Sequence, residues 1–136
     1  MTHTVTGRTR TAPAVLTALR VLAVLTVVVL AWQFLTAGSL VGPGGAEGAE
    51  ALHATGAIVL HVVSGLTMIA AALVRRGGAA SRPMIVAALV FVLSFVQAYF
   101  GEGATLWIHV PGAMVLTVGA VLVAAWAFTP GVGGRR

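Results

Sequence analysis

Four long runs of apolar residues determine what this chain can fold into. They cover about 15–37, 51–74, 84–100 and 104–128, and each is close to the ~20 residues with which a helix crosses a bilayer. The runs are continuous rather than alternating, and four strands in lipid would leave unpaired edges. Only 8% of the residues are charged, against about 25% in a soluble domain. The sequence therefore predicts an all-α, integral membrane four-helix bundle.

The connections between the runs predict two helical hairpins. The Gly-rich segment 38–50 joins the first two runs, and the short basic segment RRGGAASRP (75–83) joins the second and third. The third and fourth runs are separated only by GEG (101–103), a turn so tight that their helices must be antiparallel neighbours. We expect the head (1–13) and the tail TPGVGGRR (129–136) to be unstructured.

Charge predicts the orientation of the bundle. The chain has no lysine, and all its basic residues fall on one side of the predicted bundle: Arg8, Arg10, Arg20, Arg75, Arg76, Arg82, Arg135 and Arg136. The acidic residues fall on the other side: Glu47, Glu50 and Glu102. The positive-inside rule then places both termini in the cytoplasm of a cell whose plasma membrane holds the protein. We expect Arg20, inside the first run, to reach back to the inner interface, and we expect no nucleic-acid partner.

A cleaved signal peptide is the alternative interpretation of the first run, with its apolar region at 21–31. The run is long for such a region, and TAGS (36–39) matches a cleavage site only loosely. We therefore interpret the run as a membrane span.

A short motif occurs twice, as HATGAIVL (53–60) and HVPGAMVL (109–116). Both copies begin helices that enter from the outer side. His53 and His109 should therefore lie within a few Å of the same depth, near the outer face. Side chains of this kind can meet across the core of a four-helix bundle.

The motif places a glycine three residues after each histidine, on the same helical face. Gly56 and Gly112 should leave a gap beside each imidazole, which a flat macrocycle would fill. With no cysteine for covalent attachment, the pattern predicts a non-covalently bound haem with His53 and His109 as axial ligands of the iron. Close helix packing also explains the glycines, and a histidine near a helix end can simply bond a headgroup or a loop.

Three further polar residues lie in the apolar runs. Gln33 and Gln97 end the first and third runs, where a carboxamide can bond a haem propionate, a quinone carbonyl or a histidine Nδ1–H, or join two helices. His61 lies ~12 Å deeper than His53 and is rotated by ~80°. Its repeat partner is Thr117. We expect a hydrogen-bonded core residue, with a proton relay, another haem ligand or a three-histidine metal site as alternatives.

Aromatic residues and one proline complete the pattern. Three aromatic residues predict an outer belt and one an inner belt: Trp32, Tyr99 and Trp107, then Trp126. Pro111 replaces the Thr55 of the other copy, and is tolerable if the fourth helix begins near Trp107 or Ile108, so that Pro111 lies in the first turn.

Motifs of hydrolases, ATPases and dinucleotide-binding enzymes are absent from the sequence, and no carboxylate lies inside a run. These classes therefore lack the residues that they need. Whether the protein is an enzyme stays open.

The layout resembles small four-helix membrane proteins of actinobacterial type, a family with a domain of unknown function. The resemblance covers about 20–128 and rests on a few positions: Gln33 to Gly38, Leu52-His53, Gln97 and His109. More distantly, the chain is similar to one four-helix half of a haem A synthase, with histidines on its second and fourth helices. That resemblance implies ligation of b-type haem by His53 and His109. The chain lacks the acidic residue and the cysteines of the fuller enzyme.

The sequence thus predicts a haem-binding membrane protein for electron transfer or quinone-linked redox chemistry, with a quinone or a redox protein as its partner. The predicted site contains the following residues: His53, His109, Gly56, Gly112, Gln33 and Gln97. The alternative is a non-catalytic membrane scaffold or assembly protein without a cofactor. A small carrier for an apolar or metal substrate is a third interpretation.

Overall fold

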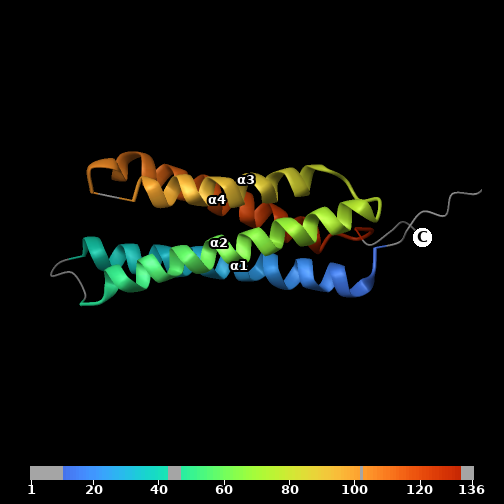
Figure 1. Ribbon diagram of the computed structural model, residues 1–136, viewed down its shortest axis with the longest axis horizontal. Helices are drawn as coiled ribbons and strands as arrows, with labels where there is room; N and C mark the ends of the chain where they lie inside the picture. The colour runs from blue at the N-terminus through green and yellow to red at the C-terminus, as the bar shows by residue number, and fades with distance from the viewer. Residues whose placement is uncertain (1–10, 43–46, 102, 133–136) are drawn as a thin grey trace, which may run out of the picture.

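The computed structural model of the protein describes residues 11–42, 47–101 and 103–132. In them, four helices run along one long axis (Figure 1): α1 (Pro13–Val41), α2 (Ala49–Arg76), α3 (Arg82–Tyr99) and α4 (Leu106–Ala127), the last preceded by the single turn η1 (Gly103–Thr105). Each of the four is long and apolar enough to cross a membrane. The predicted all-α bundle of four membrane helices is therefore confirmed.

Helices α1 and α2 extend beyond the predicted runs at both ends, α3 begins two residues earlier than predicted, and α4 is shorter than its run at both ends. Pro13 and Pro83 lie in the first turns of α1 and α3, where a missing backbone N–H costs nothing. Gly42 and Gly77 follow the last residues of α1 and α2 and donate their N–H groups to carbonyls of those helices. Helix α3 ends at Tyr99 and η1 begins at Gly103, so the predicted short connection is found. Glu102 lies outside the described residues.

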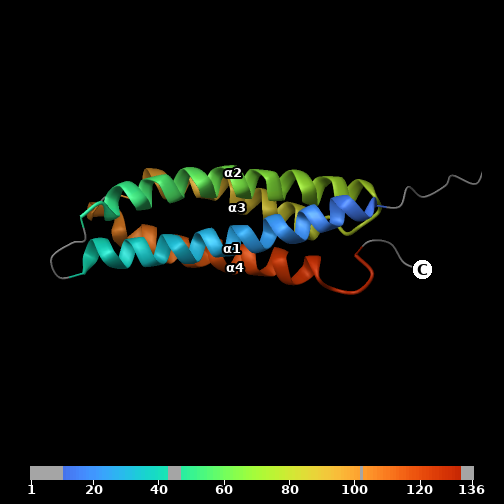
Figure 2. The same cartoon turned by 90° about the horizontal axis from the view of Figure 1, so that it is seen from below.

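Successive helices are antiparallel and form two hairpins, α1/α2 and α3/α4. Helix α1 packs on α2 and α4, and α3 packs on the same two helices, so α2 and α4 face each other across the diagonal (Figure 2). The described chain begins and ends at the same end of the bundle (Figure 1). We call this the terminal end and the opposite one the loop end.

The terminal end holds the largest apolar cluster, which includes Leu19, Val74 and Ala127. Val132 is only 9% exposed and joins this cluster, and the Thr11 hydroxyl donates to the Val74 carbonyl at 3.3 Å. The expectation of an unstructured head and tail is therefore wrong for residues 11–13 and 129–132, because Thr11 bonds α2, Pro13 begins α1 and Val132 packs on the core. The predictions for 1–10 and 133–136 lie outside the described residues.

Arg20 joins the first and last helices at the terminal end. Its Nε donates to the carbonyl of Ala127 at 3.0 Å, and its guanidinium lies 5.4 Å from the ring centre of Phe128. The last carbonyls of a helix lack partners and carry partial negative charge. Arg20 therefore caps α4, which the sequence pattern alone did not predict.

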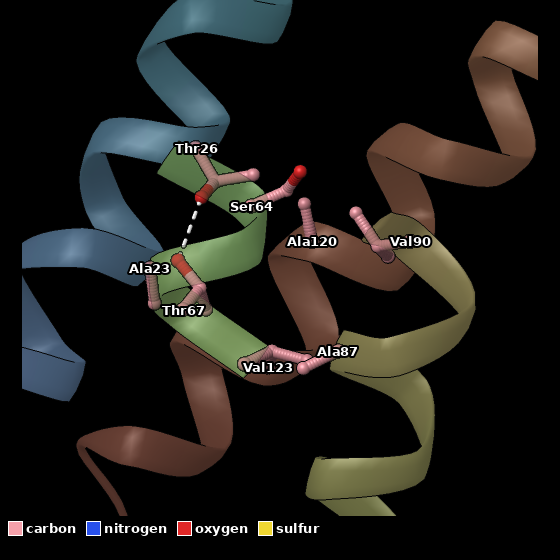
Figure 3. A pocket seen from close by; sticks show the side chains of 8 residues that line it. All are labelled: Ala23, Thr26, Ser64, Thr67, Ala87, Val90, Ala120 and Val123. Atoms are coloured by element: carbon pink, nitrogen blue, oxygen red, sulfur yellow. Dashed lines mark hydrogen bonds between the residues drawn. The ribbon is translucent and has the colours of Figure 1, made fainter. Parts of the chain in front are cut away.

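The middle of the bundle is made of small side chains (Figure 3). The buried hydroxyls of Thr26 and Thr67 are 3.0 Å apart and join α1 to α2. The buried Ser64 hydroxyl donates to the Leu60 carbonyl of its own helix at 2.6 Å. The small void between these residues and their neighbours measures about 10 Å³, at most the space of one water molecule. Small residues here allow the helices to approach closely.

The aromatic residues fit two belts. Trp32, Tyr99 and Trp107 lie towards the loop end, with 45%, 81% and 75% of their surface exposed, as contact with lipid headgroups requires. Trp126 lies near the terminal end and packs partly against its core cluster.

Candidate functional site

His53 and His109 meet near the loop end. They come from α2 and α4, the diagonal pair of helices, and their ring centres are 6.4 Å apart with the ring planes at 62°. Both side chains are half-buried. The structure thus brings together the two histidines of the sequence repeat.

Hydrogen bonds determine which ring nitrogen of each histidine is protonated in the neutral imidazole. His109 Nδ1 lies 2.9 Å from the carbonyl oxygen of Gln97. A carbonyl only accepts, so Nδ1 carries the hydrogen and Nε2 keeps its lone pair. The sequence did not indicate this partner. Every residue has a backbone carbonyl, so a residue pattern does not show which carbonyl accepts the hydrogen bond.

A hydroxyl group favours the same tautomer of His53, with the hydrogen on Nδ1. Its Nδ1 lies 2.9 Å from Thr36 Oγ1, and that hydroxyl is 3.1 Å from the carbonyls of Trp32 and Gln33. When Thr36 donates to these carbonyls, its oxygen accepts from Nδ1–H. In that arrangement both imidazoles are bonded through Nδ1 to the first helix of their own hairpin, and the lone pair of each neutral ring lies on Nε2. Thr36 was missed in the sequence, although it lies one helical turn after Gln33.

The space beside Gly56 and Gly112 is already filled. A Cβ at Gly56 would collide with the carboxamide of Gln33 and lie 3.1 Å from Trp32 Cδ1. One at Gly112 would collide with the carboxamide of Gln97. We expected a gap that a macrocycle would fill. The glycines instead admit a glutamine from the neighbouring helix, once in each hairpin, and direct contact between them and a cofactor stays a prediction.

The two glutamines leave acceptors unused. Gln33 Oε1 and Gln97 Oε1 are buried and have no hydrogen-bond partner among the described residues. Of the predicted roles, helix joining is the one seen directly, since each carboxamide lies against the glycine of the adjacent helix. A buried acceptor without a donor costs about 1–3 kcal/mol. A ligand or water that supplies a donor would relieve that cost.

His61 lies deeper on α2 and has partners of its own. Its Nδ1 is 2.8 Å from Ser94 Oγ, and Ser94 donates to the Phe91 carbonyl at 2.6 Å. The Ser94 oxygen therefore accepts from Nδ1–H, and the lone pair of His61 is again on Nε2. The ring stacks on Phe95 with 4.1 Å between ring centres and 14° between planes. The prediction of a hydrogen-bonded residue is confirmed, while its partner Ser94 was not foreseen.

One cavity connects these polar groups. It has a volume of about 550 Å³, and its lining is mostly apolar but includes all three helical histidines and both glutamines. Glu50 borders it towards the loop end, and Leu60 and Leu116 lie at its deeper part. A volume of this size falls in the range of small-molecule and cofactor sites.

The cavity is only partly enclosed, and several of its lining residues are exposed. Phe34 and Val110 line it between α1 and α4, and their side chains are 42% and 50% exposed. Ile58 lines it on α2 and is 65% exposed. These residues face lipid in a membrane-spanning bundle.

The described residues contain no group of three or more His, Cys, Asp or Glu side chains placed to hold a metal ion. His61 is thus not joined to His53 and His109 in one cluster, and the three-histidine metal site considered from the sequence is not formed. Of the two histidine sites considered from the sequence, the pair of His53 and His109 is the one whose side chains lie close together.

Pro111 lies deeper in α4 than expected. The helix begins at Leu106, so Pro111 is in the second turn and deprives the Trp107 carbonyl of its usual i→i+4 donor. The expectation that it falls in the first turn is wrong, because the helix begins one or two residues before the start at Trp107 or Ile108 that this expectation required. His109 remains in register with His53 despite this missing bond.

Comparison of the chain with protein-family models, with curated proteins and with solved structures finds no match.

Proposed function

We propose that this integral membrane protein binds one b-type haem between α2 and α4, with His53 and His109 as the two axial ligands, and that it transfers electrons. The observation that carries the proposal is the separation of the two imidazoles. A metal ion bound by two opposed imidazole nitrogens at about 2 Å each separates the ring centres by about 6.3 Å. The separation here is 6.4 Å.

The hydrogen bonds at Nδ1 support the same assignment. Histidine ligands of metals usually donate their second ring N–H to a carbonyl or hydroxyl, which orients the ring and makes the bound nitrogen more basic. The Gln97 carbonyl does this for His109, and the Thr36 hydroxyl does it for His53. Each ring therefore presents the lone pair that iron requires.

The surroundings fit a flat, largely apolar cofactor. The cavity of about 550 Å³ is lined mostly by apolar side chains, and the chain has no cysteine with which to attach a haem covalently. A bound haem supplies one-electron chemistry at its iron. The protein supplies the two imidazoles, keeps water away with its apolar lining, and offers the Gln33 and Gln97 carboxamides near the ligands.

The distribution of arginine supports the orientation predicted from the sequence. Arg20, Arg75, Arg76 and Arg82 belong to the terminal end of the bundle, and Glu47 and Glu50 to the loop end. Under the positive-inside rule the terminal end is cytoplasmic and the haem lies near the outer face of the plasma membrane.

Visible spectroscopy tests the proposal. The protein is expressed with a haem precursor, purified in detergent and compared with its His53→Ala, His109→Ala and Thr117→Val variants. We expect a Soret band and a low-spin spectrum in the parent and in Thr117→Val, and loss of that spectrum in each histidine variant. A folded parent protein that stays colourless, or histidine variants that keep the parent spectrum, would overturn the assignment.

A cofactor-free scaffold is the second candidate function. It is favoured by the fact that each histidine already joins two helices, His53 to Thr36 and His109 to Gln97. In that case the histidine variants lower the stability of the bundle, and the parent protein binds no haem.

A further inference from the structure

His61 lines the inner part of the cavity and has a set of partners separate from those of the histidine pair. Eight residues along α2 separate His61 from His53, which corresponds to ~12 Å along the helix axis. His61 lines the same cavity, but its hydrogen-bond partner and its stacking partner both come from α3. Its surroundings therefore do not overlap with those of the histidine pair.

We propose that His61, held in place by Ser94 and Phe95, binds the hydroxylated ring of a lipid-soluble quinol. The inference deepens the proposed haem function and rests on it for its purpose, because a quinol beside a haem gives that haem an electron partner. Binding itself depends only on the residues around His61.

The chemistry of His61 selects a ligand that donates a hydrogen bond. Ser94 holds the hydrogen on Nδ1, so Nε2 is an acceptor in the neutral ring. A quinol hydroxyl donates to such a nitrogen, whereas the carbonyl of the corresponding quinone cannot. The expected preference is thus for the reduced, hydroxylated form.

Shape and access favour the same class of ligand. Phe95 stacks face to face on the His61 ring from outside the cavity lining and fixes the plane of the imidazole. The rest of the lining is mostly apolar and includes the exposed Ile58, along which an isoprenoid tail can lie. A water-soluble donor such as a sugar would have to cross an apolar lining.

The experiment measures binding of decylubiquinol and of its dimethyl ether, which has the same ring and tail but no hydroxyl hydrogen. The protein is placed in lipid nanodiscs under anaerobic conditions, with empty nanodiscs as the partition control, and both haem-loaded and haem-free samples are titrated. We expect the parent protein to bind the quinol about tenfold more tightly than the ether.

Variants connect this preference to His61. His61→Leu should bind both compounds with the affinity that the parent shows for the ether. His61→Gln should keep part of the preference, because its amide oxygen still accepts. Thr117→Val is the matched control: Thr117 is the repeat counterpart of His61, its hydroxyl bonds only its own helix at Ala113, and it should leave both affinities unchanged.

The outcomes separate this inference from the haem proposal. Equal binding of quinol and ether by the parent protein, or an undiminished preference in His61→Leu, would overturn the inference whatever the haem content. A parent protein that prefers the quinol but takes up no haem would support the His61 site and refute the haem proposal.

Discussion

Gly56 and Gly112 determine how closely the two helices of each hairpin approach near the histidines. Each lies under the carboxamide of a glutamine from the neighbouring helix, and each lies one turn after a histidine. Because the carboxamide and the imidazole occupy adjacent levels of the same hairpin, displacement of the glutamine should also disturb the histidine. The glycines therefore act on the site through packing.

The first prediction concerns this packing. Gly56→Ala should lower the free energy of unfolding by about 1–3 kcal/mol relative to Gly38→Ala, because the new methyl group displaces Gln33. Gly38 lies in α1, where a Cβ has no neighbour within 4 Å, so its substitution reports the helix propensity of alanine alone. Titration with a denaturing detergent measures both. Adding Gln33→Ala to Gly56→Ala should restore part of the loss, and an unaltered cost in the double variant would contradict the packing argument.

The sequence could predict the residues of the site but not their partners. The repeat identified His53, His109 and the two glycines, because a shared spacing reports a shared helical face. Thr36 and Ser94 were missed, since a hydroxyl in an apolar run usually bonds its own helix and only the fold shows which one also meets an imidazole. The role of the glycines changed because a sequence cannot tell whether a neighbouring side chain fills an opening.

At the scale of helices, hydrogen bonds between helices fix their positions along one another, which apolar packing alone does not determine. Thr26 and Thr67 join α1 to α2 in the middle of the bundle, and Arg20 joins α1 to α4 at the terminal end. Lipid is as apolar as the helix faces, so such contacts and close packing carry much of helix association.

The second prediction tests the threonine pair. A double-mutant cycle of Thr26→Val and Thr67→Val should give a coupling of about 0.6 kcal/mol, the average for hydrogen bonds between membrane helices. Valine keeps the shape of threonine and removes the hydroxyl. The same cycle with Thr26→Val and Thr117→Val should give no coupling, because Thr117 bonds Ala113 of its own helix. Equal couplings in the two cycles would show that the contact is not what stabilises the pair.

The third prediction tests the cap on α4. Arg20→Met should reduce the free energy of unfolding by about 1 kcal/mol, because the last carbonyls of α4 lose a charged donor. Arg76→Met, which changes an exposed arginine at the same end, is the control and should cost less than half as much. If both variants unfold alike, the contact with Ala127 does not contribute to stability.

At the scale of the whole molecule, the number of helices and their antiparallel order could be predicted, and the diagonal pairing could not. Length and apolarity alone select helices in a bilayer, and the short connection at 101–103 requires neighbouring helices. Which helices lie across the diagonal depends on side-chain fit along their whole length. The turn of 129–132 over the core was missed for a similar reason, since Val132 is the one apolar anchor in a segment rich in glycine.

The fourth prediction concerns orientation and uses the absence of cysteine from the chain. Single variants Glu47→Cys and Ala80→Cys introduce one thiol at each end of the bundle, both at exposed positions. In intact cells a membrane-impermeant maleimide should label Glu47→Cys, and should label Ala80→Cys only after permeabilisation, because the arginine-rich end is retained inside. The reverse pattern would place the histidine pair near the cytoplasm.

Each imidazole is tied to its own hairpin, His53 through Thr36 and His109 through Gln97, so neither ring can swing independently without losing its bond. A change in the distance between the two rings therefore requires one hairpin to shift as a rigid unit against the other. The distance between the two imidazoles therefore depends on how the α1/α2 hairpin is placed against the α3/α4 hairpin. A spectroscopic probe of that distance would measure any displacement of one hairpin relative to the other.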